Sequence, residues 1–133
     1  MKILALETSA KSVSCAVVED GAPLASAYQC TGLTHSRTLL PMVDAMLKNA
    51  DLTIDDMDAL AIAAGPGSFT GLRIGSATAK GLGLALDIPL AAVPTVDALA
   101  YNLYGCEQLI CPMMDARRGQ VYTGIYTFVN LGH

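Results

Sequence analysis

The continuous apolar run at residues 59–64 constrains the fold of this 133-residue chain more than any other feature. Such a run is typical of a strand that is covered on both faces, as in a parallel sheet flanked by helices. Gly65-Pro66-Gly67 ends the run, and the residues that follow predict a long helix from Thr70 to Leu86. A buried strand, a glycine-rich loop and a helix in this order indicate an α/β fold.

The other apolar runs extend this pattern on both sides. Three short runs separated by turns, at residues 3–6, 13–18 and 24–28, predict a three-stranded meander. Apolar residues at three- and four-residue spacing then predict an amphipathic helix, with Thr34 or Ser36 as its N-cap and a late start or a bend at Pro41.

The elements around the long helix complete a β-β-β-α-β-α-β-α order. Residues 53–56 resemble a short capped turn, and a strand at residues 90–93 leads into a helix that we expect Thr95 to cap. Hairpin-linked strands followed by α/β crossovers imply a mixed sheet with helices on its faces. Actin-like and ribonuclease-H-like lobes have this architecture.

Beyond Gly105 the pattern starts again with a predicted hairpin. Its strands are expected at residues 109–114 and 121–128, around a turn at Arg117-Arg118-Gly119. Two strands are only marginally stable unless another element covers them. We therefore expect residues 1–105 to form an actin-like lobe and residues 106–133 to be the first hairpin of an incomplete second lobe in a truncated chain.

Composition excludes several classes of protein. No stretch reaches the roughly 18 uninterrupted apolar residues of a membrane span, and the N-terminus lacks the pattern of a secretion signal, so we expect a cytoplasmic protein. The four cysteines form no C-x-x-C pair and predict reduced thiols, and His35 has no second histidine nearby as a metal ligand. The net charge of −4 and the scattered cations predict no direct nucleic-acid binding by this chain alone.

Two loops could hold an anion. Their amides and hydroxyls could bind a phosphate at the start of the long helix and after the first strand. The candidate residues are Glu7, Thr8, Ser9, Gly65, Gly67, Ser68 and Thr70. The alternative is a tight turn with close helix packing, and the charged turn at Asp115, Arg117 and Arg118 leaves the same choice between a solvated turn and anion binding.

Both long helices carry more small or apolar positions than one buried face needs. Gly71, Gly75 and Ala79 form a small-residue ladder, and the apolar stripe of the first helix is wide. Close approach to a neighbour explains the ladder. The spacing alone leaves open whether that neighbour lies in this chain or in a partner.

Four segments together closely resemble the TsaB (YeaZ) family. They read I-L-A-L-E-T-S at 3–9, H-S-R-T-L-L-P at 35–41, G-P-G-S-F-T-G-L-R-I-G at 65–75 and M-D-A-R-R-G-Q-V-Y at 114–122. The resemblance implies an actin-like, two-lobed fold. It also implies a role in the threonylcarbamoyl modification of tRNA adenosine 37, in which the sibling TsaD transfers the group and TsaB supports it.

The resemblance also implies that the chain is a non-catalytic partner. TsaD-like proteins carry an H-x-x-x-H metal motif where this chain has Thr95 and Leu99, which cannot replace imidazole ligands. It implies no catalytic residue, metal or cofactor here, with ATP and a metal at the partner proteins. Those partners are a TsaD-like transferase bound through a helical bundle and a TsaE-like ATPase in a larger complex, with a homodimer in isolation.

The implied partner interface lies on the first two helices. Its residues are Leu39, Met42, Val43, Met46, Gly71, Leu72, Gly75, Thr78 and Leu82. The competing hypothesis is an active nucleotide-binding ATPase or kinase of the actin-like superfamily, based on Glu7-Thr8-Ser9 and the glycine-rich loop.

Overall fold

The computed structural model describes residues 1–32 and 34–129. Its helices and strands follow the predicted order. They are β1 (Lys2–Glu7), β2 (Val13–Glu19), β3 (Ala22–Gln29), α1 (His35–Asn49), the 3-10 turn η1 (Ile54–Asp56), β4 (Ala59–Ala63), α2 (Phe69–Leu86), β5 (Leu90–Val93), α3 (Thr95–Ala100), the 3-10 turn η2 (Tyr101–Leu103), β6 (Met113–Arg117) and β7 (Gln120–Thr123). The predicted α/β fold is confirmed.

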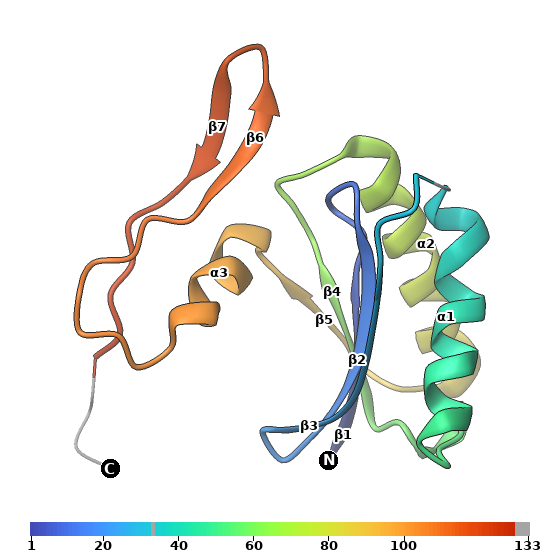
Figure 1. Ribbon diagram of the computed structural model, residues 1–133. Coiled ribbons are helices and arrows are strands. Elements are labelled where there is room, and N and C mark those ends of the chain that lie inside the picture. The colour runs from blue at the N-terminus through green and yellow to red at the C-terminus, as the bar shows by residue number, and fades with distance from the viewer. Residues whose placement is uncertain (33, 130–133) are drawn as a thin grey trace.

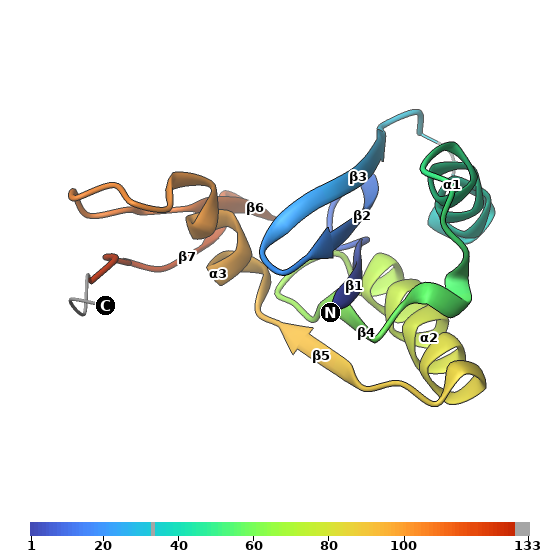
Figure 2. The same ribbon diagram turned by 90° about the horizontal axis from the view of Figure 1, so that it is seen from below.

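The first five strands form one mixed sheet in the order β3-β2-β1-β4-β5. The pairs β1–β2 and β2–β3 are antiparallel, whereas β1–β4 and β4–β5 are parallel. Helices α1 and α2 cover one face of this sheet, and α3 lies on its other side (Figures 1 and 2). The carboxyl ends of β1 and β4 therefore meet the beginnings of α1 and α2 at one end of the molecule.

The core lies between the sheet and the two long helices. Alternate side chains of β1 and β2 face it, because successive residues of a strand point to opposite faces. The buried members of this core are Leu4, Leu6, Val13, Cys15, Val17, Leu39, Met42, Val43, Met46, Leu47, Met57, Leu60, Ile62 and Ala79. Apolar residues from every part of residues 1–86 thus form one cluster.

Details at helix ends differ from the sequence-based predictions. Helix α1 continues through Pro41, so the predicted late start is wrong, and its N-cap Thr34 makes no side-chain capping bond. Thr95 is the first residue of α3 rather than its cap, and its hydroxyl instead accepts a hydrogen bond from the amide of Gly65. The predicted capped turn is confirmed, because Thr53 and Asp56 form a capping box.

The C-terminal hairpin differs from the prediction, because β6 begins at Met113 rather than at residue 109 and β7 ends at Thr123 rather than at residue 128. The strands β6 and β7 pair with each other, and only a bridge between Ile110 and Tyr126 extends the pairing. The Tyr126 hydroxyl donates a hydrogen bond to Asp97 of α3, and the ring of Phe128 meets those of Tyr101 and Tyr104 edge-on. The segment that follows the hairpin therefore contacts α3 and η2, whereas the four residues of β7 itself are all exposed.

None of the helices within residues 1–32 and 34–129 combines the length and hydropathy that a bilayer crossing requires.

Candidate functional site

The glycine face of α2 packs against the end of β1 in the same chain. A Cβ atom on Gly71 would lie 2.0 Å from the carbonyl oxygen of Thr8, and one on Gly75 would lie 2.3 Å from the Thr8 hydroxyl. The Thr8 hydroxyl donates a 2.7 Å hydrogen bond to the carbonyl of Gly71, which fixes this approach. The small-residue ladder therefore serves packing within the chain, and the assignment of Gly71 and Gly75 to a partner interface is corrected.

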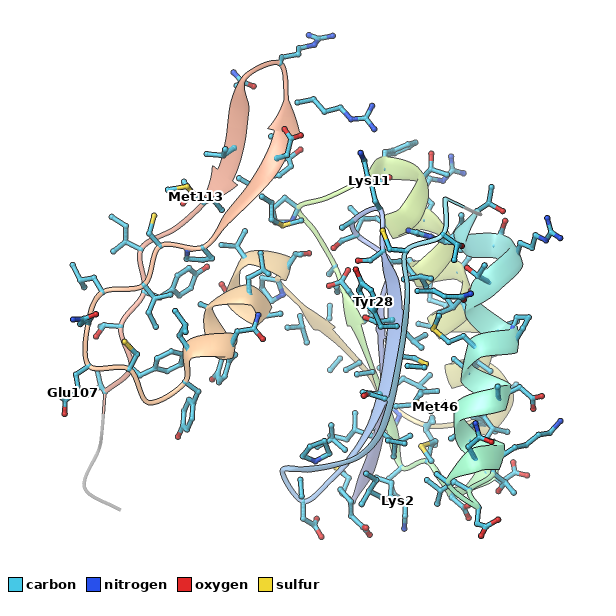
Figure 3. The ribbon with its side chains drawn as sticks, viewed as in Figure 1. Lys2, Lys11, Tyr28, Met46, Glu107 and Met113 are labelled. Atoms are coloured by element: carbon cyan, nitrogen blue, oxygen red, sulfur yellow. The ribbon has the colours of Figure 1, made fainter. Side chains whose placement is uncertain are left out.

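The apolar stripe of α1 faces the sheet as well. Four residues assigned to the interface, namely Leu39, Met42, Val43 and Met46, are buried in the core cluster. In Figure 3 the Met46 side chain lies between α1 and the sheet, and its sulfur is 3.6 Å from the Cys15 thiol. The core therefore covers most of the surface of these four side chains.

The remaining three predicted interface residues are half-buried on α2. Leu82 packs against the core, and the Thr78 hydroxyl donates to the carbonyl of Ile74 at 2.8 Å. Leu72 lies beside the glycine-rich loop, since its Cδ1 would be 3.4 Å from a Cβ on Gly65. They flank the buried face of α2 and reach its surface only in part.

The exposed surface of the two helices carries a second apolar stripe that the sequence reasoning missed. On α2 it consists of Ala77, Gly81 and Leu84, and on α1 Leu40 is exposed; Leu84 is 86% exposed. A Cβ on Gly81 would meet no atom within 4 Å. We call these four residues the outward helix face. Its signal was present in the sequence, because residues 77, 81 and 84 have helical spacing.

The β1–β2 turn satisfies its own hydrogen bonds. The Glu7 carboxylate accepts bonds from the amide of Ser9, at 2.6 Å, and from the Ser9 hydroxyl. The amide of Ser68 donates to the carbonyl of Ser9 at 2.7 Å, and a Cβ on Gly67 would lie only 2.5 Å from that oxygen. The glycine-rich loop therefore lies directly on the turn.

The other groups of the loop are also engaged within the chain. The Ser68 hydroxyl accepts from the amide of Gly71 at 3.3 Å, as an N-cap does. Gly65 exchanges two hydrogen bonds with Thr95, whose hydroxyl accepts from the Gly65 amide at 3.1 Å. Two predicted phosphate ligands, Gly67 and the exposed Thr70, take no part in these bonds. A phosphate held between loop and turn would have to break the direct hydrogen bond from the Ser68 amide to the Ser9 carbonyl.

Thr95 and Leu99 stand at the two positions that correspond to the metal motif of the sibling family. Thr95 is buried and tied to Gly65, while Leu99 is partly exposed. The ring of His35 bonds the carbonyl of Ala10 through Nε2 at 2.7 Å. In residues 1–32 and 34–129 no three side chains of His, Cys, Asp or Glu gather closely enough to hold a metal ion.

Comparison with known proteins agrees with this architecture. The family model described as "TsaD: tRNA N6-adenosine threonylcarbamoyltransferase" matches residues 29–132. The TsaB protein of Bacillus subtilis, named "tRNA threonylcarbamoyladenosine biosynthesis protein TsaB", is 40% identical over 98% of this chain and 57% of the relative. The TsaB protein of Escherichia coli is 36% identical over 95% of this chain and 55% of the relative.

A solved structure matches equally well. It is titled "YeaZ from Pseudomonas aeruginosa", is 37% identical, and superposes with a TM-score of 0.84 over 96% of this chain and 60% of that one. The chain thus spans little more than half the length of the relatives it matches. It belongs to the family of that tRNA threonylcarbamoyltransferase model, and within it to the neighbourhood of the TsaB (YeaZ) proteins.

Proposed function

We propose that this chain is a non-catalytic pairing subunit that binds a TsaD-type transferase in the threonylcarbamoylation of tRNA adenosine 37. The observation that carries the proposal is the outward helix face. Leu84 and Leu40 are exposed on two helices whose inner faces are already filled by the core. Exposed apolar residues on the outer side of a helix mark a surface that another helix can cover.

The small residues of this face suit helix pairing in particular. Helix axes pack about 8–10 Å apart, and the distance depends on the side chains at the contact. Ala77 and Gly81 would let a partner helix come close, and Leu84 beside them supplies apolar area. Burial of this apolar area against a partner helix would stabilise the complex by about 25 cal/mol for each square ångström removed from water. The pairing surface is therefore proposed on the outward helix face in place of the buried residues first assigned to it.

The proposal that the chain is non-catalytic rests on the polar groups of the β1–β2 turn and the glycine-rich loop. Glu7, Thr8 and Ser68 all make hydrogen bonds within the chain, so a nucleotide would have to displace them. Thr95 holds Gly65 at a position where the sibling proteins carry a metal ligand. ATP hydrolysis above background that disappears in Glu7→Ala would contradict this part of the proposal.

We place both proposed partners, the transferase and a second copy of the chain, on the outward helix face. The outward helix face can hold one helix pair at a time, so a TsaD-like transferase and a second copy of this chain would compete for it. We propose the homodimer as the form in isolation, and the transferase complex, joined by a TsaE-like ATPase, as the working form. ATP and a metal belong to those partners in this scheme.

The test is co-purification of the chain with a TsaD-like protein from the same source. Gly81→Arg should abolish the complex, because the new side chain stands where a partner helix would approach. Gly81→Ala is the matched control and should keep the complex, since a Cβ there meets open space. Retention of the complex by Gly81→Arg, or failure of the wild-type chain to bind, would contradict the proposal.

A further inference from the structure

The charged residues of the chain are separated between the two ends of the sheet. Acidic residues gather where β1 begins and where α1 and α2 end, in the loops and turns of that region. They are Glu19, Asp20, Asp51, Asp55, Asp56, Asp58 and Asp87. Lys2 lies at this end and Lys11 at the opposite one, as Figure 3 shows. The net charge of −4 hides this separation.

Three exposed cations lie on the elements that meet at the end opposite to the acidic residues. The ring of His35 bonds the carbonyl of Ala10, and Thr8 bonds Gly71, so the β1–β2 turn and the first turns of α1 and α2 meet there. Lys11 directly follows Ala10, Arg37 lies two residues after His35, and Arg73 lies two residues after Gly71; all three cations are exposed. We call these three residues the basic end.

In the part of the chain that the structure describes the basic end makes no ion pair, although Glu7, the last residue of β1, lies at the same end. The ion pairs of residues 1–32 and 34–129 join Met1 to Asp20, Lys2 to Glu19 and Lys48 to Asp44, and none involves the basic end. Neither α1 nor α2 has an acidic residue in its first turn. The carboxylate closest in sequence, Glu7, is engaged by Ser9.

Two further features lie at this end. The guanidinium of Arg73 lies over the ring of Phe69, 5.3 Å from its centroid, and that ring is 74% exposed. The turn of the β6–β7 hairpin, with exposed Arg117 and Arg118, points to the same end of the molecule (Figure 1). Asp115 is the acidic residue of this turn, and its carboxylate accepts a bond from the amide of Arg117.

We propose that the basic end is a contact site for the phosphate backbone of RNA. The six residues of β1 span about 20 Å, whereas charges in physiological salt are screened beyond about 8 Å. The acidic end therefore does not cancel the field at the basic end. Surfaces that bind single-stranded nucleic acid combine such cations with an exposed aromatic ring on which a base stacks.

An RNA explains more of this surface than an acidic protein does. Cations alone would serve either ligand, but an exposed ring beside Arg73 offers a stacking face that a carboxylate chain does not use. The inference revises the expectation that the chain makes no direct contact with nucleic acid. It takes from the proposed function only the choice of tRNA as the probe, and it does not require a transferase.

The experiment measures binding of an unmodified tRNA transcript with adenosine at position 37 to the full chain, over a range of salt concentrations. The variant Lys11→Gln/Arg73→Gln should bind several-fold more weakly and lower the slope of log affinity against log salt by about 1.4, which is about 0.7 for each lost contact. The control Lys48→Gln/Lys80→Gln has the same net charge and should bind like the wild type. Phe69→Ala should lose about tenfold in affinity with an unchanged slope.

Three outcomes would overturn the inference. They are no binding of the transcript by the wild-type chain at low salt, equal losses in the two double variants, and displacement of the RNA by polyglutamate at an equal concentration of charge. The last would indicate an acidic protein ligand. Circular dichroism verifies that each variant is folded. Gly81→Arg should keep RNA binding while losing the transferase, so failure of this inference and failure of the proposed function are separate results.

Discussion

Two glycines of α2 differ in what surrounds them. A Cβ on Gly75 would lie 2.3 Å from the Thr8 hydroxyl, whereas one on Gly81 would meet nothing within 4 Å. Alanine in place of a helical glycine stabilises by about 1 kcal/mol, but overpacking costs about 1–3 kcal/mol. We expect Gly81→Ala to raise the free energy of unfolding by about 1 kcal/mol. Gly75→Ala should lower it, and equal effects in urea denaturation would contradict this packing.

The burial of Cys15 predicts that the free energy of unfolding depends on pH in the alkaline range. Cys15 is buried on β2, and burial raises the pKa of its thiol to about 11. In the unfolded chain this thiol loses its proton above about pH 8.5, whereas in the folded chain it stays protonated to a higher pH. Between the two pKa values, deprotonation therefore stabilises the unfolded state relative to the folded one. The contribution of Cys15 to stability is therefore complete below that pH and is lost as the pH rises toward 11.

The corresponding measurement is denaturation across the alkaline range. Cys15→Ala should reduce the decline of the free energy of unfolding with pH. Cys30→Ala is the control, because Cys30 is exposed, and it should leave the decline unchanged. A decline that is the same in both variants would show that other groups cause it.

At the scale of elements, the segment after the hairpin is joined to α3 by the Tyr126–Asp97 hydrogen bond and to the η2 region by ring contacts of Phe128. The hydrogen bond to Asp97 favours the protonated phenol and raises the pKa of Tyr126. Tyr126→Phe removes this bond. We expect faster hydrogen exchange at the amides of Ile110 and Tyr126, which bond each other's carbonyls at 2.8 Å.

Tyr122→Phe is the matched control for this prediction, because Tyr122 lies on β7 beyond the bridge. It should leave exchange at Ile110 unchanged. The same contact predicts a pH effect, since the bond is intact below the pKa of the unfolded tyrosine and is lost as the pH rises through that of the folded one. Unchanged exchange in Tyr126→Phe would show that the rings alone hold the segment.

Elements with strong local signals could be predicted, and elements defined by pairing could not. The apolar run and glycine loop located β4 and α2 to within a residue of their observed bounds. The first hairpin strand was predicted at residues 109–114 but runs over Met113–Arg117, and the second was predicted at residues 121–128 but ends at Thr123. An apolar run does not say which of its residues find a partner strand.

For the whole molecule, two exposed apolar surfaces are candidates for the contact in the proposed homodimer. One is the outward helix face, and the other is the C-terminal segment, where Leu109 and Ile125 are 75% and 76% exposed. If the proposed dimer forms through the helices, Gly81→Arg should sediment as a monomer at tens of micromolar. Leu109→Lys/Ile125→Lys should remain a dimer. A wild-type monomer, or the reverse pattern in the variants, would contradict the proposed dimer.

The sequence by itself determined the order of elements, the mixed sheet and the family, because periodicity, turn residues and motifs are local properties. The tertiary structure alone decided which small-residue stripe of α2 faces the sheet, since 71–75–79 and 77–81–84 have equally good helical spacing. It also decided that the loop lies directly on the turn, and that most acids lie at the end opposite to the basic end. These are relations between segments far apart in the chain, and packing and screened charge act through distance in space.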